Sequence, residues 1–218
     1  TTVQHAEEIV TAVQKAGVTG AGGAGFPTFF KLKARAEVVI ANGAECEPLT
    51  HVDKELLHHH TNEVLRGLKA VMAATGAPKG VIGIKRMYAD LVAKLRVAMA
   101  DTPELSVAEL GNFYPAGDEQ VLVYDVTGRV VPEGGLPLNV GCVVQNIETL
   151  VNVAAALDGT PVTTKYITVI GAVRSPLTVR VPLGITLRQV LELAGGATVP
   201  DPVVLNGGAM MGDVAEGL

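Results

Sequence analysis

Residues 37–48 read EVVIANGAECEP, an apolar run that ends abruptly in a polar cluster. The first part, 37–42, has the β-branched and apolar composition of a short buried strand. Asn42, Glu45 and Glu47 then place one amide and two carboxylates directly after it. The stretch therefore predicts a strand that delivers its carboxyl end to a polar loop.

Alternating helix and strand patterns follow this stretch. Residues 53–72 have the apolar spacing of one amphipathic helix, and a Gly/Pro segment at 76–78 ends it. Residues 79–85, KGVIGIK, are typical of a buried strand, and 88–100 of a further amphipathic helix. This order predicts a parallel sheet covered by helices, whose ligands bind beyond the carboxyl ends of the strands.

The flanking sequence continues this pattern less regularly. A helix is expected over 3–13, with Gly17 ending it, and a weak strand over 105–110. Residues 111–128 predict a polar turn that leads into a helix. After a Pro/Gly-rich loop, the last helix of this part begins near residue 146 and runs to Gly159. Together these elements predict a Rossmann-like α/β domain over 1–162.

From Thr164 onward, alternating strand patterns replace the helical ones. The predicted elements are strands at 166–173 and 177–183, a short helix at 187–196 and a strand at 203–206. This ββαβ order in about fifty residues is typical of a small β-grasp module. We therefore expect a second domain over 163–218.

Composition excludes several classes of function. The chain has 218 residues, of which 48% are hydrophobic, and 22 acidic against 17 basic residues, so no broad nucleic-acid surface is expected. Cys46 and Cys142 form no metal-ligand or disulfide pattern. No apolar run is long enough to span a membrane. These features predict a cytoplasmic protein without a metal site.

The glycine-rich stretch GVTGAGGAGFPTFFKL, residues 17–32, allows more than one interpretation. GAGGAG imitates a dinucleotide-binding fingerprint, but that fingerprint follows a strand, whereas this stretch follows a predicted helix. Glycines also serve where a backbone approaches an anion closely, or where a loop packs tightly. Taken alone, the stretch leaves these alternatives open.

Three further polar loops carry ligand-binding chemistry. The carboxylates after the first strand could bind ribose hydroxyls, or could belong to a solvated turn and a helix cap. Residues 114–119, YPAGDE, place an aromatic ring, a glycine and two acids before a helix. Residues 145–149, QNIET, supply amide and hydroxyl groups at another helix start, where an anion can also use free backbone N–H groups.

Two other conspicuous groups are expected to be structural. His58, His59 and His60 are consecutive on a predicted helix, so they point about 100° apart and cannot all bind one metal. Met210 and Met211 are expected to pack in a core or between domains.

The order GxGGAGFPT, NGAECEP, YPAGDE and QNIETL, taken together, resembles a family of flavin- and NADH-binding subunits. This family includes the 51-kilodalton subunit of respiratory complex I, the RnfC component of Rnf complexes and the PduS-type cobalamin reductases. The stretch from 167 to 184 and the ending LNGGAMMG strengthen the likeness to the cobalamin reductases and their Rnf relatives. The second domain resembles the soluble-ligand-binding β-grasp (SLBB) module.

The resemblance implies that the glycine loop holds FMN phosphate and ribose through its backbone. It also places Phe26 near the nicotinamide, Lys31 on the flavin and Glu47 facing NADH, and it implies no catalytic side chain. The implied cofactor-binding residues are Gly20, Gly22, Gly23, Gly25, Phe26, Lys31, Asn42, Glu45, Glu47, Tyr114, Gly117, Asp118, Glu119, Gln145, Asn146 and Thr149.

By the same resemblance the chain is an FMN-dependent NADH oxidoreductase that passes electrons to a partner. The implied acceptor is cobalamin, a corrinoid enzyme or adenosyltransferase, or another electron-transfer subunit, and the implied location includes a bacterial microcompartment. Alternatives are a non-catalytic docking module and an RnfC-type subunit. In longer relatives a cysteine-rich segment with iron–sulfur clusters follows a GGPMMG stretch; this sequence ends shortly after GGAMMG, so no cluster is expected in it.

Overall fold

The computed structural model describes residues 2–23 and 25–217. The chain forms two compact units, which are described separately below. The first unit contains Thr1–Ala44 and Asp53–Val162, and the second contains Glu45–Val52 and Thr163–Leu218. The chain therefore leaves the first unit after Ala44, returns at Asp53 and leaves it again after Val162. The domain boundary expected from the sequence stays a prediction.

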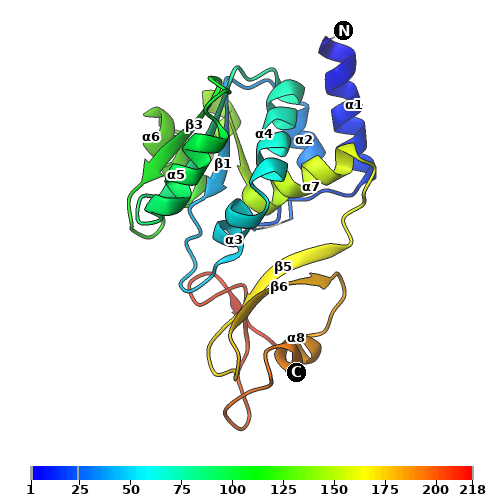
Figure 1. Ribbon diagram of the computed structural model, residues 1–218, viewed down its shortest axis with the longest axis vertical. Helices are drawn as coiled ribbons and strands as arrows, with labels where there is room; N and C mark the ends of the chain where they lie inside the picture. The colour runs from blue at the N-terminus through cyan, green and yellow to red at the C-terminus, as the bar shows by residue number, and fades with distance from the viewer. Residues whose placement is uncertain (1, 24, 218) are drawn as a thin grey trace. The chain divides into compact units, whose positions relative to one another are not determined.

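A four-stranded parallel sheet lies at the centre of the first unit (Figure 1). Its order is β3 (Leu105–Leu110), β2 (Lys79–Lys85), β1 (Val38–Gly43) and β4 (Cys142–Asn146). All three neighbouring pairs are parallel. The predicted Rossmann-like α/β fold is confirmed. The strand β4, however, was not predicted from the sequence.

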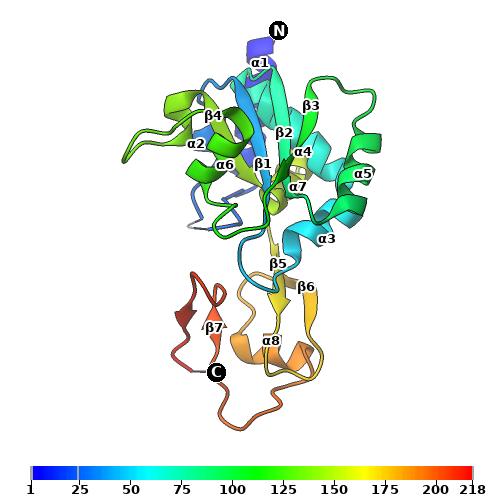
Figure 2. The same ribbon diagram turned by 90° about the vertical axis from the view of Figure 1, so that its left-hand side faces the viewer.

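Helices cover both faces of this sheet (Figure 2). They are α1 (Thr2–Lys15), α2 (Thr28–Leu32), α3 (Val52–His59), α4 (Thr61–Thr75), α5 (Ala89–Ala98), α6 (Glu119–Thr127) and α7 (Ile147–Leu157), with a short 3-10 helix η1 (Pro137–Val140). Leu122 and Val123 of α6 pack with Val38 and Ile40 of β1. Since side chains alternate along a strand, the residues between these face α4 and α7 on the other side.

The single helix predicted over 53–72 is wrong. The structure has two helices, α3 and α4, separated at His60, whose backbone (φ −125°, ψ 33°) is not helical. His58 and His59 end α3, whereas His60 is the N-cap of α4. A helical pattern of apolar residues that continues across a one-residue break cannot reveal the break, because both helices pack on the same core.

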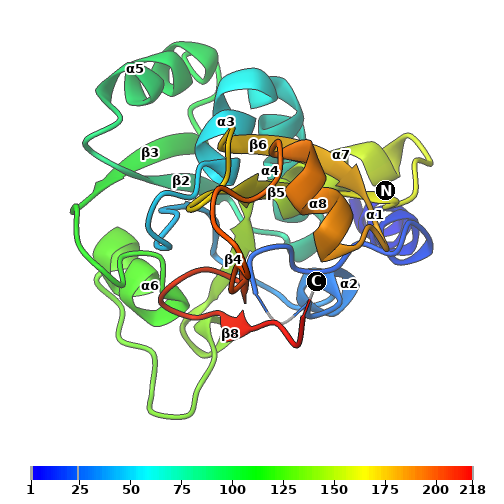
Figure 3. The ribbon, with the colours of Figure 1, turned by 90° about the horizontal axis from the view of Figure 1, so that it is seen from below.

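The second unit consists of two small antiparallel sheets and a helix (Figure 3). β5 (Thr164–Val169) pairs with β6 (Leu177–Pro182), and α8 (Leu187–Leu193) follows with Thr186 as its capping residue. Two-residue strands β7 (Leu205–Asn206) and β8 (Asp213–Val214) pair across the turn 207–212. The predicted order of two strands, a helix and a strand is present, and the last strand forms its own short hairpin.

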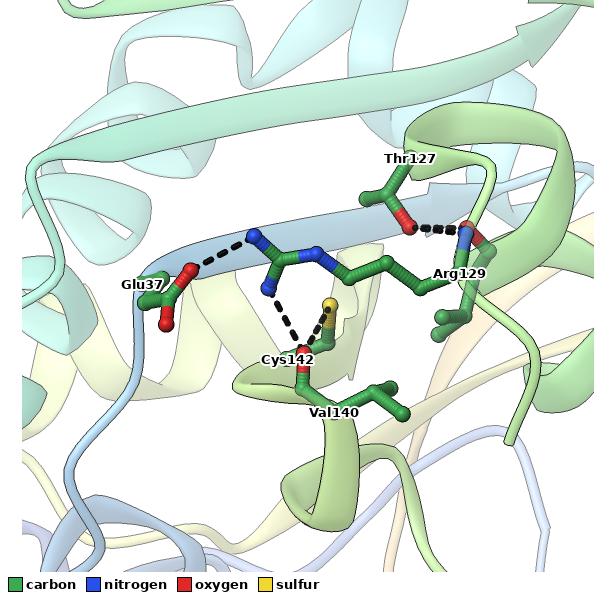
Figure 4. A network of polar contacts seen from close by, with 6 residues as sticks. Glu37, Thr127, Arg129, Val140 and Cys142 are labelled. Carbon is green, nitrogen blue, oxygen red and sulfur yellow. Dashed lines mark hydrogen bonds and ion pairs between the residues drawn. The ribbon is translucent and has the colours of Figure 1, made fainter. Parts of the chain in front are cut away.

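A polar network holds the amino-terminal ends of β1 and β4 (Figure 4). Arg129 donates to the Glu37 carboxylate at 2.5 Å and to the Val140 carbonyl at 2.6 Å. The adjacent Cys142 is fully buried, and this burial raises the pKa of its thiol. The network fixes the edge of the sheet opposite to the one where the strands deliver their polar loops.

Two helices of the first unit approach each other very closely at Gly67. A Cβ atom on Gly67 of α4 would lie 2.0 Å from the Leu150 carbonyl oxygen of α7. Real side chains do not tolerate this distance from a backbone atom, so only glycine allows α4 and α7 to pack at this separation. This contact fixes α7 against the sheet, and α7 begins at the end of β4.

Gly67→Ala should therefore force α4 and α7 apart. We expect a loss of about 3 kcal/mol in the free energy of unfolding, because the clash involves backbone that cannot move aside. Denaturant unfolding followed by circular dichroism measures this loss. Lys69→Ala, on the exposed face of the same helix, is the control and should change stability by less than about 0.5 kcal/mol. Equal effects of the two substitutions would contradict the packing argument.

Candidate flavin site

The order of the strands reverses between β1 and β4. From β1 the chain continues to β2 and β3 on one side, and then crosses to β4 on the other side. In open parallel sheets this reversal leaves a crevice at the carboxyl ends of the two strands, where ligands bind. Asn42 of β1 and Asn146 of β4 are register partners at this edge. Two of the predicted site residues therefore lie side by side.

Asn146 connects three segments of the first unit. Its Oδ1 accepts the Glu148 backbone N–H at 2.8 Å and so caps α7. Its Nδ2 lies 3.0 Å from both carboxylate oxygens of Asp53 on α3. The same side chain also faces the glycine loop, because a Cβ atom on Gly22 would come within 2.9 Å of Nδ2. Asn146 therefore joins β4, α3 and the glycine loop.

The glycine loop is held by backbone contacts and by one hydroxyl. The Ala21 backbone N–H donates to Thr149 Oγ1 at 2.9 Å, and the Gly20 N–H donates to the Phe26 carbonyl at 2.8 Å. Gly25 has φ +68°, a conformation that favours glycine. Among the residues that the structure describes, none lies within 4 Å of a Cβ atom built on Gly23. This loop is thus fixed at its base and open at Gly23.

Asn42 ties β1 to the loop that precedes α6. Its Nδ2 donates to the Gly117 carbonyl at 2.8 Å, and its Oδ1 accepts the Ala44 N–H at 3.2 Å. Asp118 caps α6 by accepting the N–H groups of Gln120 and Val121. The YPAGDE loop is therefore placed at the same edge of the sheet as the glycine loop.

Lys31 brings α2 and α6 together at the outer edge of β4. Its Nζ donates to Glu119 Oε1 at 3.0 Å and to the Val144 carbonyl at 3.1 Å. β4 is an edge strand, so this contact satisfies a carbonyl that no neighbouring strand can reach. The ammonium group remains partly exposed and adds positive charge beside the glycine loop.

Two residues of the QNIET segment are buried within the protein. Thr149 is fully buried and supports the glycine loop, and Gln145 is 3% exposed. Gln145 Nε2 has no hydrogen-bond partner among residues 2–23 and 25–217, yet protein atoms cover it. A direct contact of either side chain with a ligand would require neighbouring atoms to move. Their flavin-binding role stays a prediction.

Two aromatic side chains of the predicted site are exposed. Phe26 is 53% exposed and Tyr114 is 45% exposed. The Phe26 ring lies 6.0 Å from that of Phe30, which in turn stacks on Phe29 at 4.3 Å between ring centroids. An exposed ring after the glycine loop is available for stacking on a flat ligand.

The remaining two predicted residues, Glu45 and Glu47, belong to the second unit. The Glu47 carboxylate accepts the backbone N–H groups of Met210 and Met211 at 3.0 and 2.8 Å. The expectation that these methionines pack in a core is wrong, because their exposed fractions are 52% and 76%. The glutamate instead fixes the turn that carries them.

Asp53 is the functional-site residue that the sequence interpretation missed. The sequence pattern assigns it only to a helix, although the structure buries it and places its carboxylate on Asn146. The available signal was weak: an acid in the first turn of a helix is usually an exposed partner of the helix dipole. Nothing in the sequence shows that this one faces inward.

Residues 13–155 match the family model described as the Nuo51 FMN-binding domain. The chain belongs to this family. Residues 166–214 match the SLBB domain. The predicted family and the predicted type of the second domain are both confirmed. The Nuo51-type unit is the one that contains the crevice between β1 and β4.

Relatives of this Nuo51-type chain include named electron-transfer proteins. It is 47% identical over 214 residues to the cobalamin reductase PduS of Salmonella typhimurium, in a match that covers 98% of this chain and 47% of that protein. It is 36% identical over 213 residues to the RnfC-type component of the Na+-translocating ferredoxin:NAD+ oxidoreductase complex of Acetobacterium woodii, over 95% of this chain and 48% of that protein. The chain thus spans about half the length of these relatives.

A solved structure supports the same assignment. The crystal structure of an NAD+-reducing NiFe hydrogenase in the H2-reduced state matches with a TM-score of 0.76 at 29% identity. The match covers 91% of this chain and 40% of that chain. Among the residues that the structure describes, no helix has the length and apolar character needed to cross a bilayer.

The residues present fit an FMN group. The glycine loop offers exposed backbone and open space at Gly23, where a ligand can approach closely. Lys31 supplies a partly exposed positive charge, and the half-buried amides of Asn42 and Asn146 supply polar groups. This donor set suits a flat, polar ring that carries a phosphate.

The Glu47 contact generates a prediction for the second unit. A Cβ atom on Gly208 (φ +99°) would lie 2.3 Å from Glu47 Oε2, so Gly208→Ala should break this contact. We expect a loss of about 2 kcal/mol in stability of the second unit, read as a lower thermal unfolding midpoint.

Gly184→Ala is the matched control for this substitution. Gly184 has a similar φ of +87°, and among the described residues none lies within 4 Å of its Cβ position. It therefore carries the backbone strain without the collision. If both variants lose the same stability, the Glu47 contact does not contribute to the unit.

Proposed function

We propose that this chain is the flavin-binding part of an electron-transfer oxidoreductase, with FMN held in the crevice between β1 and β4. The observation that supports this most is the meeting of the glycine loop, Asn42, Asn146 and Lys31 at that edge. The family of the chain and the names of its relatives point to the same cofactor.

Each group at the edge has a separate task in this proposal. The exposed backbone of the glycine loop binds the phosphate and ribose, and Thr149 keeps that loop in place. Lys31 compensates negative charge on the ligand, while its bonds to Glu119 and Val144 hold the ammonium group in position. FMN, when bound, supplies the conversion between a two-electron hydride donor and single-electron transfer. No side chain is needed as a general base.

NADH is the proposed electron donor, and Phe26 is the residue proposed to stack on its nicotinamide. The exposed ring leaves room for this contact. The hydrogenase relative is described as NAD+-reducing, and the Salmonella relative as a cobalamin reductase. We therefore propose cobalamin, bound to a corrinoid partner, as the acceptor, and propanediol utilisation in a microcompartment as the setting.

An RnfC-type subunit is the second candidate, supported by the 36% identity to the Acetobacterium woodii protein. Both candidates use the same flavin site and differ in the acceptor, a corrinoid in one and a membrane complex in the other. A non-catalytic docking module, by contrast, would not retain flavin.

Titration with FMN tests the proposal. The purified chain should quench flavin fluorescence with saturable binding, and NADH added without oxygen should bleach the visible absorbance of the bound flavin. Bleaching without a partner protein supports the oxidoreductase, whereas a folded chain that never retains FMN contradicts it. Cobalamin added after bleaching should restore the flavin absorbance if a corrinoid is the acceptor.

Gly23→Val tests the position of the flavin. The valine side chain would project into space that no described residue fills, so the fold should be unchanged while FMN affinity falls by roughly tenfold or more. Gly22→Val is less informative because its side chain would collide with Asn146.

Gly159→Ala controls for general loss of stability in this experiment. Gly159 (φ +76°) follows the carboxyl end of α7, whereas the proposed site lies at the amino end of that helix. This variant is strained, yet it should bind FMN with the affinity of the unmodified chain. Unchanged affinity in Gly23→Val would place the flavin elsewhere.

A further inference from the structure

Asp53 is a buried acid that the proposed chemistry does not use. It is 8% exposed and lies in the first turn of α3, where the chain returns to the first unit. Both of its carboxylate oxygens lie 3.0 Å from Asn146 Nδ2. A buried carboxylate is costly to desolvate, so its placement on one amide of the proposed site calls for a reason.

The chemistry of a carboxylate fixes which way the Asn146 amide points. The two ends of an asparagine amide have nearly the same shape, so packing alone does not distinguish them. The Asp53 carboxylate accepts hydrogen bonds, and therefore selects the NH2 end of Asn146. The carbonyl end is then turned to the Glu148 N–H, which it accepts at 2.8 Å. One acid thus sets the amide orientation and the cap of α7 together.

The oriented amide supports the glycine loop. A Cβ atom on Gly22 would lie 2.9, 3.2 and 3.3 Å from three atoms of the Asn146 side chain, so this side chain is the surface on which Gly22 rests. Thr149, in the first turn of α7, holds the neighbouring Ala21 N–H. The amino end of α7 therefore supports the loop at two adjacent residues, and Asp53 fixes one of them.

We propose that Asp53 is a positioning residue for the cofactor site: it orients the Asn146 amide and, through it, the Gly22 segment of the glycine loop, without contacting the ligand. This inference rests on the proposed function for its link to FMN. Its structural part, the orientation of Asn146 by Asp53, is independent of any ligand.

Three variants separate the geometry of the pair from its presence. Asp53→Ala removes the acceptor and should weaken FMN binding by roughly tenfold. Asp53→Asn keeps one carbonyl oxygen that can accept from Asn146, and should retain FMN affinity within roughly threefold. Asn146→Asp sets two carboxyl groups against each other and should lose affinity at least as strongly as Asp53→Ala.

The exchanged pair Asp53→Asn/Asn146→Asp is the decisive variant. The new amide at 53 can donate to the new carboxylate at 146, whose second oxygen can still cap α7, since aspartate and asparagine are comparable caps. We expect this double variant to recover the thermal stability that Asn146→Asp loses and to bind FMN more tightly than that single variant. No recovery of stability would overturn the proposal.

A direct readout does not need flavin. The side-chain amide of Asn146 should give two well-separated proton signals in nitrogen-correlated NMR spectra, and Asp53→Ala should shift or broaden them while leaving Asn42 signals in place. Unchanged Asn146 signals would overturn the inference. The two proposals fail separately: absence of FMN binding by the unmodified chain rejects the function, whereas tight FMN binding by both the unmodified chain and Asp53→Ala rejects the role of Asp53.

Discussion

The side chain of Asn146 is the contact on which the first unit depends. It ends β4, caps α7, accepts the support of α3 and carries the Gly22 segment of the glycine loop. These segments lie far apart in the sequence, so their convergence on one amide places the loop at the strand edge more rigidly than backbone packing alone would. The close packing of α4 on α7 at Gly67 then holds the amide against the sheet.

Most polar side chains at this edge bind the protein itself. Thr149 holds the glycine loop, Asp118 caps α6 and Asn42 ties the YPAGDE loop to β1. A site built this way presents a ligand mainly with oriented backbone and with a few partly exposed groups such as Lys31. Such preorganisation reduces the ordering cost of binding. In this account, flavin affinity depends on the residues that shape the loop as much as on those that contact the ligand.

The sequence predicted the class of the fold and the identity of the loops, because strand and helix periods and glycine punctuation are local signals. β4 escaped prediction since CVVQN is short and follows an irregular loop, although it is the strand that creates the crevice. The inward direction of Asp53 and the exposure of Met210 depend on tertiary contacts, which no local pattern encodes. The four motifs indicated a flavin site together, whereas the division between residues that face a ligand and residues that support the loop required coordinates.

The most direct test of this account is a crystal structure of the chain with FMN. The account predicts flavin density at the carboxyl edge of β1 and β4, with the phosphate against the backbone of the glycine loop and with Asn146 still bonded to Asp53. Density elsewhere, for example in the open groove of about 580 Å³ lined by Leu183, Gln189 and Leu193 in the second unit, would contradict it.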